Sequence, residues 1–344
     1  MRHLRSPSRH ARIVASVAAA WVAFASASAH GQEVRGPTPY LSTSAFLRDL
    51  TARKPGAKPA LRPPNDGRGV DFSRYGPSRF VDHVRATPLE IGLAAAAIGV
   101  VGVTDWKWGG ARFHWAKEGF FGKNTHNGGM DKLGHAWTSY VLTEMLAERM
   151  AANTDGLSGA HLSAAIVAFG IMAGVETGDA YTRRYGFSRG SVADGAGVAL
   201  ALLRGAFPKL REVMDYRVTA KFGDDANSIP KVGGGRTVPA YNRQRYILAI
   251  KGSGFEGLKA TPLRYAELQF AYDTRGFHSV ERKLGIKPQR NFYVGVGLNL
   301  SELLFGEGPV PNFAPARDTE LVWAVEHALR YVQVPYTAAY ARRR

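Results

Sequence analysis

Apolar positions between residues 87 and 212 recur with the period of an α-helix, and this pattern predicts four helices. Thr87, Pro88 and Glu90 form a strong helix start, because threonine can cap, proline suits the first turn and the glutamate stands three residues after the cap. An apolar run over 91–103 continues this first helix. Three further helices are expected over 130–152, 161–182 and 191–207, and the short loops between them favour an antiparallel bundle.

Beyond residue 213 the apolar period changes from 3.6 to 2, which predicts an antiparallel β-meander. The expected strands cover 216–222, 245–251, 264–272 and 292–300, with a fifth at 331–336, and a helix is expected over 318–329. The predicted fold class is therefore α+β. A four-helix core, the helical bundle domain (87–212), precedes a C-terminal antiparallel sheet domain with one helix (213–344).

Residues 1–29 have the form of a signal peptide. Arginines and histidines precede an apolar run, and Ala27, Ser28 and Ala29 give the small-x-small pattern that a signal peptidase accepts. Cleavage near Ala29 would export the chain, and an uncleaved membrane anchor is the alternative. Residues 30–86 are rich in proline and are predicted to be poorly structured, apart from a short helix over 44–53.

The 344 residues carry a net charge of +17 and contain no cysteine. The basic charge is diffuse and lies in no nucleic-acid-binding motif, so we expect no nucleic acid as a partner. An envelope lipid, glycan or protein, or a membrane surface, suits this charge instead. The absence of cysteine excludes disulfides, thiol chemistry and a lipid-modified cysteine after the signal. These features fit the periplasm or the periplasmic face of a bacterial membrane.

Two stretches allow a membrane-related alternative. The apolar run over 91–103 is shorter than the ~20 residues that span a bilayer, so it predicts a buried core helix, with a short membrane-embedded helix as the alternative. The aromatic segment over 105–126 predicts either a connector packed over the end of the bundle, or an interfacial belt or pocket lid.

The candidate chemistry lies at the helix ends. Asp131 and His135 are four residues apart, so they share one face of their helix. Glu176 ends a long apolar run near the C-terminal end of its helix, where the helix dipole disfavours a negative charge. Asp179 could pair with Arg183, and Asp194 lies in a helix start that resembles a capping box.

Taken together, these helix ends predict a polar cluster at one end of the bundle, formed by Asp131, Lys132, His135, Glu176, Asp179 and Asp194. Buried charges must be paired, metal-bound or functional. His135 and Glu176 are the candidate catalytic residues. The candidate ligands of a divalent metal are Asp131, His135, Glu176 and Asp194, and the candidate anion-binding residues are Arg183, Arg184 and Arg189.

The residues around this cluster resemble those of a known family. The segments 113–122 and 128–135, followed by Glu176, the loop 185–188 and Asp194, are similar to the YfiM-like predicted periplasmic lipoproteins, a domain of unknown function. The order of Asp131, Lys132, His135, Glu176 and Asp194 is also similar to that of VanZ-like proteins, in the helical half only. The first resemblance implies a cell-envelope protein, although this chain lacks the cysteine that lipoprotein members need.

Two functions follow as hypotheses. The first is an exported cell-envelope protein that acts as a binding or structural module, with the polar cluster buried in the bundle. The alternative is a metal-assisted hydrolase or transferase that acts on an envelope lipid or glycan, with a divalent metal as cofactor.

Overall fold

The computed structural model describes residues 75–116, 119–121, 125, 127–183, 185–188, 190–221, 241–308 and 320–343. The predicted signal peptide with its cleavage near Ala29 and the predicted helix over 44–53 lie outside the described residues. So do Arg184 and Arg189, two of the three arginines expected to bind an anion.

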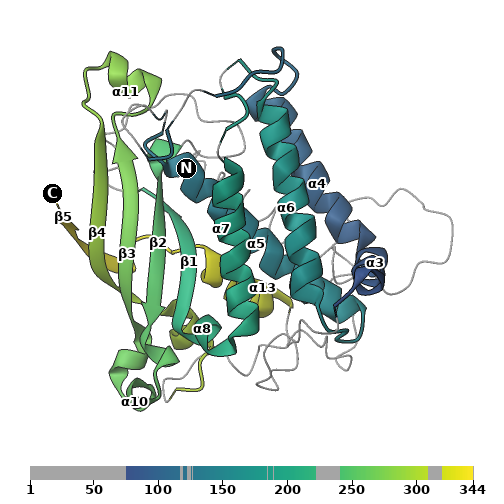
Figure 1. Cartoon of the computed structure of the whole chain (residues 1–344). Coiled ribbons are helices and arrows are strands. Elements are labelled where there is room, and N and C mark those ends of the chain that lie inside the picture. Colours follow the sequence, from purple (N-terminus) through teal and green to yellow (C-terminus); the bar gives the residue numbers. More distant parts are fainter. Residues whose placement is uncertain are drawn as a thin grey trace, which may run out of the picture.

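The first half of the described chain is helical (Figure 1). Its main elements are α3 (Pro77–Ala86), α4 (Pro88–Val101), a π-helical turn (Gly102–Trp106), α5 (Met130–Asn153), α6 (Ala160–Asp179), α7 (Gly190–Ala206) and α8 (Pro208–Val213). The four predicted helices correspond to α4, α5, α6 and α7. The helix α3 corrects the prediction of a poorly structured segment up to residue 86. Its buried His83 is held by Ser163 of α6 and by the Leu157 carbonyl, contacts that the local composition does not reveal.

Small residues let the helices of the bundle approach closely. Ala94 of α4 and three alanines of α6 pack with Leu142, Leu146 and Met150 of α5 in one buried cluster. Nearer the start of α5, Gly197 of α7 lies against the Ala136 backbone. The long helix α5 is therefore the centre of the bundle, with α4 and α6 on one side and α7 beside it (Figure 1).

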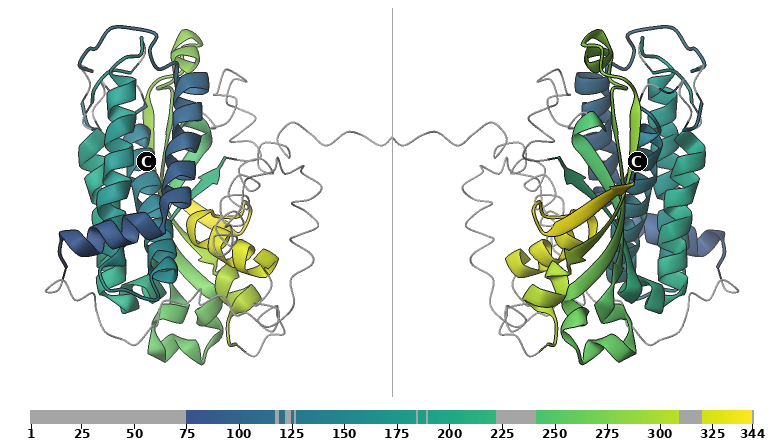
Figure 2. Two further views of the ribbon diagram at one scale, coloured as in Figure 1. Left: turned by 90° about the vertical axis from the view of Figure 1, so that its right-hand side faces the viewer. Right: turned by 90° about the vertical axis from the view of Figure 1, so that its left-hand side faces the viewer.

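The second half of the chain contains a five-stranded antiparallel sheet in the order β1-β2-β3-β4-β5, so the predicted α+β fold is confirmed. The strands are β1 (Met214–Ala220), β2 (Gln244–Lys251), β3 (Ala266–Arg275), β4 (Gln289–Leu298) and β5 (Ala338–Arg343). Short helices connect or flank them: α10 (Glu256–Lys259), α11 (Ser279–Lys283), α12 (Leu300–Phe305) and α13 (Glu320–Tyr331). In the side views, α13 (yellow) lies on the opposite side of the molecule from α6 (Figure 2).

The fifth strand and the start of the third differ from the prediction. The helix α13 continues to Tyr331, and the strand expected over 331–336 lies instead at Ala338–Arg343. Tyr331 is buried against Tyr140 of α5, and this tertiary contact extends the helix. The strand expected from residue 264 begins at Ala266, because a 3-10 turn starts at Pro262 and is capped by Thr261.

The sheet joins the bundle through tyrosines at one end of α5 and through buried ion pairs further along. Tyr216 donates to the Leu133 carbonyl at 3.0 Å, and Tyr272 donates to the Gly128 carbonyl at 2.5 Å. Arg204 of α7 donates to Glu144 of α5 at 3.0 Å and to Asp215 of β1 at 3.3 Å. Since these groups are buried, each charge is compensated within the interface between bundle and sheet.

Candidate functional site

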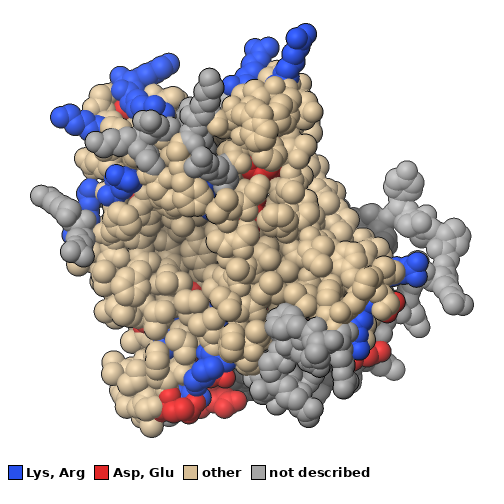
Figure 3. All heavy atoms as spheres, in the orientation of Figure 1, with Lys and Arg blue, Asp and Glu red and all other residues tan. Residues whose placement is uncertain are grey.

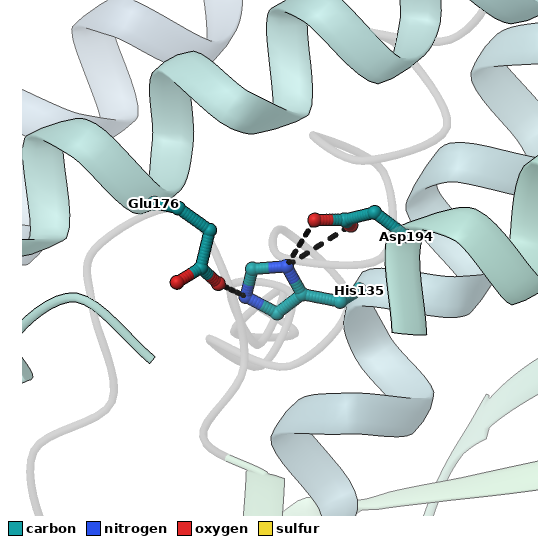
Figure 4. Close-up of side chains that lie close together, drawn as sticks. All are labelled: His135, Glu176 and Asp194. Atoms are coloured by element: carbon teal, nitrogen blue, oxygen red, sulfur yellow. Dashed lines mark hydrogen bonds and ion pairs between the residues drawn. The ribbon is translucent and has the colours of Figure 1, made fainter. Parts of the chain in front are cut away.

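Three helix ends meet in the upper part of the molecule as drawn in Figure 1. The helix α5 begins there, α6 ends there and α7 begins there, as antiparallel succession requires. His135 lies in the second turn of α5, Glu176 in the last turn of α6 and Asp194 in the second turn of α7. Figure 4 shows that the three side chains point toward one another.

The His135 ring lies between two carboxylates. Its Nδ1 atom is 3.1 Å from Asp194 Oδ1 and 3.3 Å from Oδ2, and its Nε2 atom is 3.5 Å from Glu176 Oε1 (Figure 4). Both acids are buried, and 12% of the His135 side chain remains exposed. Within the described part of the chain, these three residues form the group whose potential ligand atoms all lie within 4.8 Å of one another.

This arrangement favours a positive charge on or beside the ring. A neutral imidazole has one N–H and can donate to only one carboxylate, so the other nitrogen would face the second acid with its lone pair. Burial lowers the pKa of His135, but the hydrogen bond and charge of Asp194 and the charge of Glu176 outweigh it and raise the pKa above its ordinary value. A second proton on the ring, or a bound cation at Nε2, satisfies both acids.

Hydroxyl groups hold the two carboxylates in place. Ser139, one turn after His135, donates to Asp194 Oδ1 at 2.8 Å. The backbone N–H of Ser188 donates to Glu176 Oε2 at 3.0 Å, and the Ser188 hydroxyl lies 3.3 Å from the same oxygen. Gly190 lies directly against the Glu176 carboxylate, because a Cβ atom at this position would lie 1.7 Å from Glu176 Oε1.

Asp131 and Lys132 form a neighbouring pair and do not join the three-residue group. Lys132 is buried, and its Nζ atom lies 2.6 Å from Asp131 Oδ2 and 3.3 Å from the Ser188 hydroxyl. The other oxygen, Asp131 Oδ1, is buried and accepts no hydrogen bond from any described residue. Asp131, a predicted ligand, therefore lies outside the group of His135, Glu176 and Asp194 and faces Lys132, which contacts Ser188 beside Glu176.

Asp179 lies beside the cluster with a partner of its own. Trp108 Nε1 donates to Asp179 Oδ1 at 2.8 Å, while Arg183, its predicted partner, donates to the Gly110 carbonyl. Burial raises the pKa of Asp179 to about 6, although the Trp108 hydrogen bond acts in the opposite direction. Asp179 can therefore exchange a proton near neutral pH.

Several residues of the site were not predicted. Ser139 and Ser188 position the carboxylates, and Tyr241 and Tyr246 lie so close to Gly134 that a Cβ there would be 2.9 Å from each. Ser139 follows His135 by four residues and Ser188 lies just before α7, so the sequence could have indicated both serines as neighbours of the site. The tyrosines come from the sheet half, more than a hundred residues away, and local sequence carries no signal for them.

The spacing of His135 and Glu176 fits two ligands of one cation. With metal–ligand distances of ~2.0–2.2 Å and a tetrahedral angle, two such donors lie about 3.4 Å apart, close to the 3.5 Å between Nε2 and Oε1. Asp194 at Nδ1 then occupies the place of the carboxylate that orients a ligating histidine. The donor set of one imidazole and one carboxylate would leave further positions to water or substrate.

Comparison with known proteins places this site inside a recognised family segment. Residues 117–206 match the family model described as predicted periplasmic lipoprotein (DUF2279). That segment contains every residue of the predicted cluster, from Asp131 to Asp194. Comparisons with curated proteins and with solved structures gave no match.

The family match confirms the predicted resemblance to an uncharacterised family of periplasmic lipoproteins. It also agrees with the predicted location, the periplasm or the periplasmic face of a bacterial membrane. The likeness to VanZ-like proteins stays a prediction.

Proposed function

We propose that this exported envelope protein carries a divalent-cation centre between His135 and Glu176 and uses it in hydrolysis or group transfer on an envelope lipid or glycan. The observation that carries the proposal is the position of the His135 ring, with Asp194 at one nitrogen and Glu176 Oε1 3.5 Å from the other. Three separate helices supply these groups, so the arrangement does not arise from the local packing of one helix.

Each residue then has a distinct part. Glu176 and His135 would hold the cation, and Asp194 keeps the His135 ring oriented. Bound there, a divalent cation would polarise an ester or phosphoester oxygen and generate a nucleophilic water at neutral pH. Lys132 is buried and paired with Asp131, and its Nζ atom, 3.3 Å from the Ser188 hydroxyl, would keep that serine in place beside Glu176. Asp179, with its raised pKa, is placed to exchange a proton.

The test is metal binding by the purified chain, measured by calorimetry with Zn²⁺ and Mn²⁺ and by metal analysis. His135→Gln should reduce the affinity about 100-fold, because it removes one of two protein ligands and the ring that Asp194 orients. The matched control is His327→Gln, which removes a histidine paired with Glu148 at 2.6 Å elsewhere in the fold. If both variants bind metal as the unaltered chain does, the cation centre is wrong.

A second candidate function is a binding or structural module without a cation. The observation that favours it is that Ser139 and Ser188 already donate to Asp194 and Glu176, so a doubly protonated His135 would complete the cluster. The exposed Arg183 would then contact an anionic lipid, glycan or protein.

These two functions differ in the response of stability to metal. For a module without a cation, Zn²⁺ and Mn²⁺ leave the melting temperature unchanged, while Asp194→Asn destabilises the fold. For a cation centre, saturating metal raises the melting temperature of the unaltered chain, and that rise disappears in His135→Gln.

A further inference from the structure

The sheet has an unusual polarity along β3 and β4. Side chains at alternate positions point to one face and are apolar and 44–61% exposed: Leu268, Phe270, Phe292, Val294, Val296 and Leu298. On the opposite face Glu267, Gln269 and Asn291 are buried. A sheet in contact with water on one side normally presents its polar residues to the water and its apolar residues to the core. Along β3 and β4 the apolar side chains are exposed and the polar side chains are buried.

The exposed sheet face continues into a groove between the sheet and the helices. Leu133 of α5 lines it together with Tyr216, Tyr246, Phe270 and Phe292 of the sheet. Figure 3 shows this front of the molecule as a largely uncharged surface that is hollowed between sheet and helices. We refer to the six exposed side chains of β3 and β4 with this groove as the apolar front.

The outward faces of the helices are apolar as well. Val192 and Leu203 of α7 and Ile166 and Phe169 of α6 are exposed. Among the described residues, two helical segments, Pro88–Trp106 and Ala160–Asp179, are long and apolar enough to cross a membrane by length and composition alone; 17% of the first apolar window and 44% of the second are buried. Exposed apolar area of this extent on a soluble protein marks an interaction surface.

Charges and aromatic rings gather at one end of this surface. The loop after α4 and the helix α11 lie at the same end of the molecule (Figure 1). The exposed cations lie in the loop after α4 (Lys107 and Arg112), in the loop after α6 (Arg183), and in α11 and the turn that follows it (Arg282, Lys283 and Lys287). Figure 3 shows Lys and Arg side chains projecting at that end. At the opposite end, by contrast, exposed cations pair with acids, as Lys209 does with Glu212 and Glu256.

Exposed aromatic side chains accompany the cations of the upper end. Phe113, Trp115 and Tyr181 are exposed there, and Phe113 contacts each of the other two rings edge to face. Aromatic rings and cations at one level, above an apolar surface, are what a protein presents to the boundary between lipid headgroups and acyl chains. A second copy of the chain could cover the apolar front, but it would leave this one-sided gathering of cations without a partner.

We propose that the apolar front is seated against the acyl chains of a phospholipid bilayer, with the cationic and aromatic end among anionic headgroups. This membrane-binding proposal does not depend on the proposed cation centre. Its consequence is that His135, Glu176 and Asp194, which lie at the same end of the bundle, are at the level of the headgroups (Figures 1 and 4).

Vesicle flotation of the purified chain tests this membrane binding. The unaltered chain should float with phosphatidylcholine vesicles and bind more tightly when phosphatidylglycerol is added, and high salt should remove only that added part. The double variant Phe292→Asp/Val296→Asp should lower partitioning about tenfold or more, because two charges would have to enter the acyl layer. Both positions are exposed, so circular dichroism should be unchanged; because Phe292 also contacts the Tyr272 ring, the melting temperature is measured to confirm that the variant is folded at the temperature of the assay.

The matched control is Tyr336→Asp, a similar change at a side chain that is 83% exposed and lies outside the apolar front. It should float as the unaltered chain does. The proposal is overturned if the unaltered chain stays out of the vesicle fraction, or if the double variant floats equally well. If the unaltered chain forms a dimer without lipid and the double variant is a monomer, the apolar front is the interface with a second copy. That result would also overturn the proposal.

The headgroup end has its own test, Arg282→Glu/Lys283→Glu on the exposed helix α11. This variant should lose the preference for phosphatidylglycerol and keep its binding to phosphatidylcholine. An unchanged preference would contradict the assignment of this end to the anionic headgroups.

Discussion

His135 shows how much one side chain depends on its immediate neighbours. Asp194 faces its Nδ1 atom and Glu176 faces its Nε2 atom. Ser139 donates a hydrogen bond to Asp194, and Ser188 donates one to Glu176. Trp108 plays the same supporting part for Asp179, and its ring lies where a Cβ on Gly102 or Gly178 would be. The chemistry of the site therefore depends on donors that orient the acids as much as on the acids themselves.

Replacing Trp108 by phenylalanine should change the proton affinity of Asp179. The variant keeps a ring but removes the Nε1–H that stabilises the carboxylate, so the pKa of Asp179 should rise further above its present value of about 6. The buried acid should also lose about 1–3 kcal/mol of interaction free energy. Carboxyl NMR titration measures the pKa directly, and Trp115→Phe, at an exposed ring, is the control. A pKa that stays the same would show that the hydrogen bond does not act on the acid.

At the scale of the elements, the contact between α5 and α7 sets the position of the site. Gly197 faces the Ala136 backbone, one residue after His135, and a Cβ there would lie 2.0 Å from the Ala136 carbonyl oxygen. Gly195 of the same helix would meet nothing within 4 Å. Close approach at Gly197 brings Asp194 within hydrogen-bonding distance of His135.

The two glycines should respond in opposite directions to alanine. Gly197→Ala should push α7 away from α5 and lower the free energy of unfolding by about 1–3 kcal/mol. Gly195→Ala should raise it by up to about 1 kcal/mol, because alanine favours the helix where space is open. Urea unfolding of both variants gives the comparison, and equal stabilities would contradict the close packing of α5 on α7.

At the scale of the whole molecule, buried ion pairs join the bundle to the sheet and to α13. Glu148 of α5 lies 2.6 Å from His327 of α13, while Arg204 links α5 to β1 through Glu144 and Asp215. Burial raises the pKa of Glu148, but His327 and the arginines outweigh it and hold the pKa well below its ordinary value. The charged form of Glu148 thus favours the folded state.

Acid should therefore unfold the molecule through these acids. The unfolded glutamate has a pKa near ~4.3, and the folded value of Glu148 is lower, so its contribution is complete above the unfolded value and is lost as pH falls toward the folded one. Melting temperatures measured across this acid range should fall less steeply in Glu148→Gln than in the unaltered chain. The exposed Glu212→Gln is the control, and identical slopes for all three would show that Glu148 does not drive acid unfolding.

The sequence by itself determined the element types and the cluster of candidate residues. Helical and alternating apolar periods are local properties, so they predicted α4 to α7 and the strands of the meander, and the antiparallel order placed Asp131, Glu176 and Asp194 at one end. Local pattern also predicted the family resemblance, which the match over residues 117–206 confirms. The local pattern gave the wrong position for the fifth strand, because the buried contact of Tyr331 with α5 extends the helix α13 over the start of the expected strand.

Only the tertiary structure decided which acid faces which atom. Asp131 turns to Lys132, while Glu176 and Asp194 take the two nitrogens of His135, because helix rotation and the close approach at Gly197 set those distances. The exposed face of β3 and β4 was equally beyond a local pattern. Alternation tells which residues share a face, but the packing of the rest of the chain decides which face is covered, and here the polar face is buried and the apolar face is open.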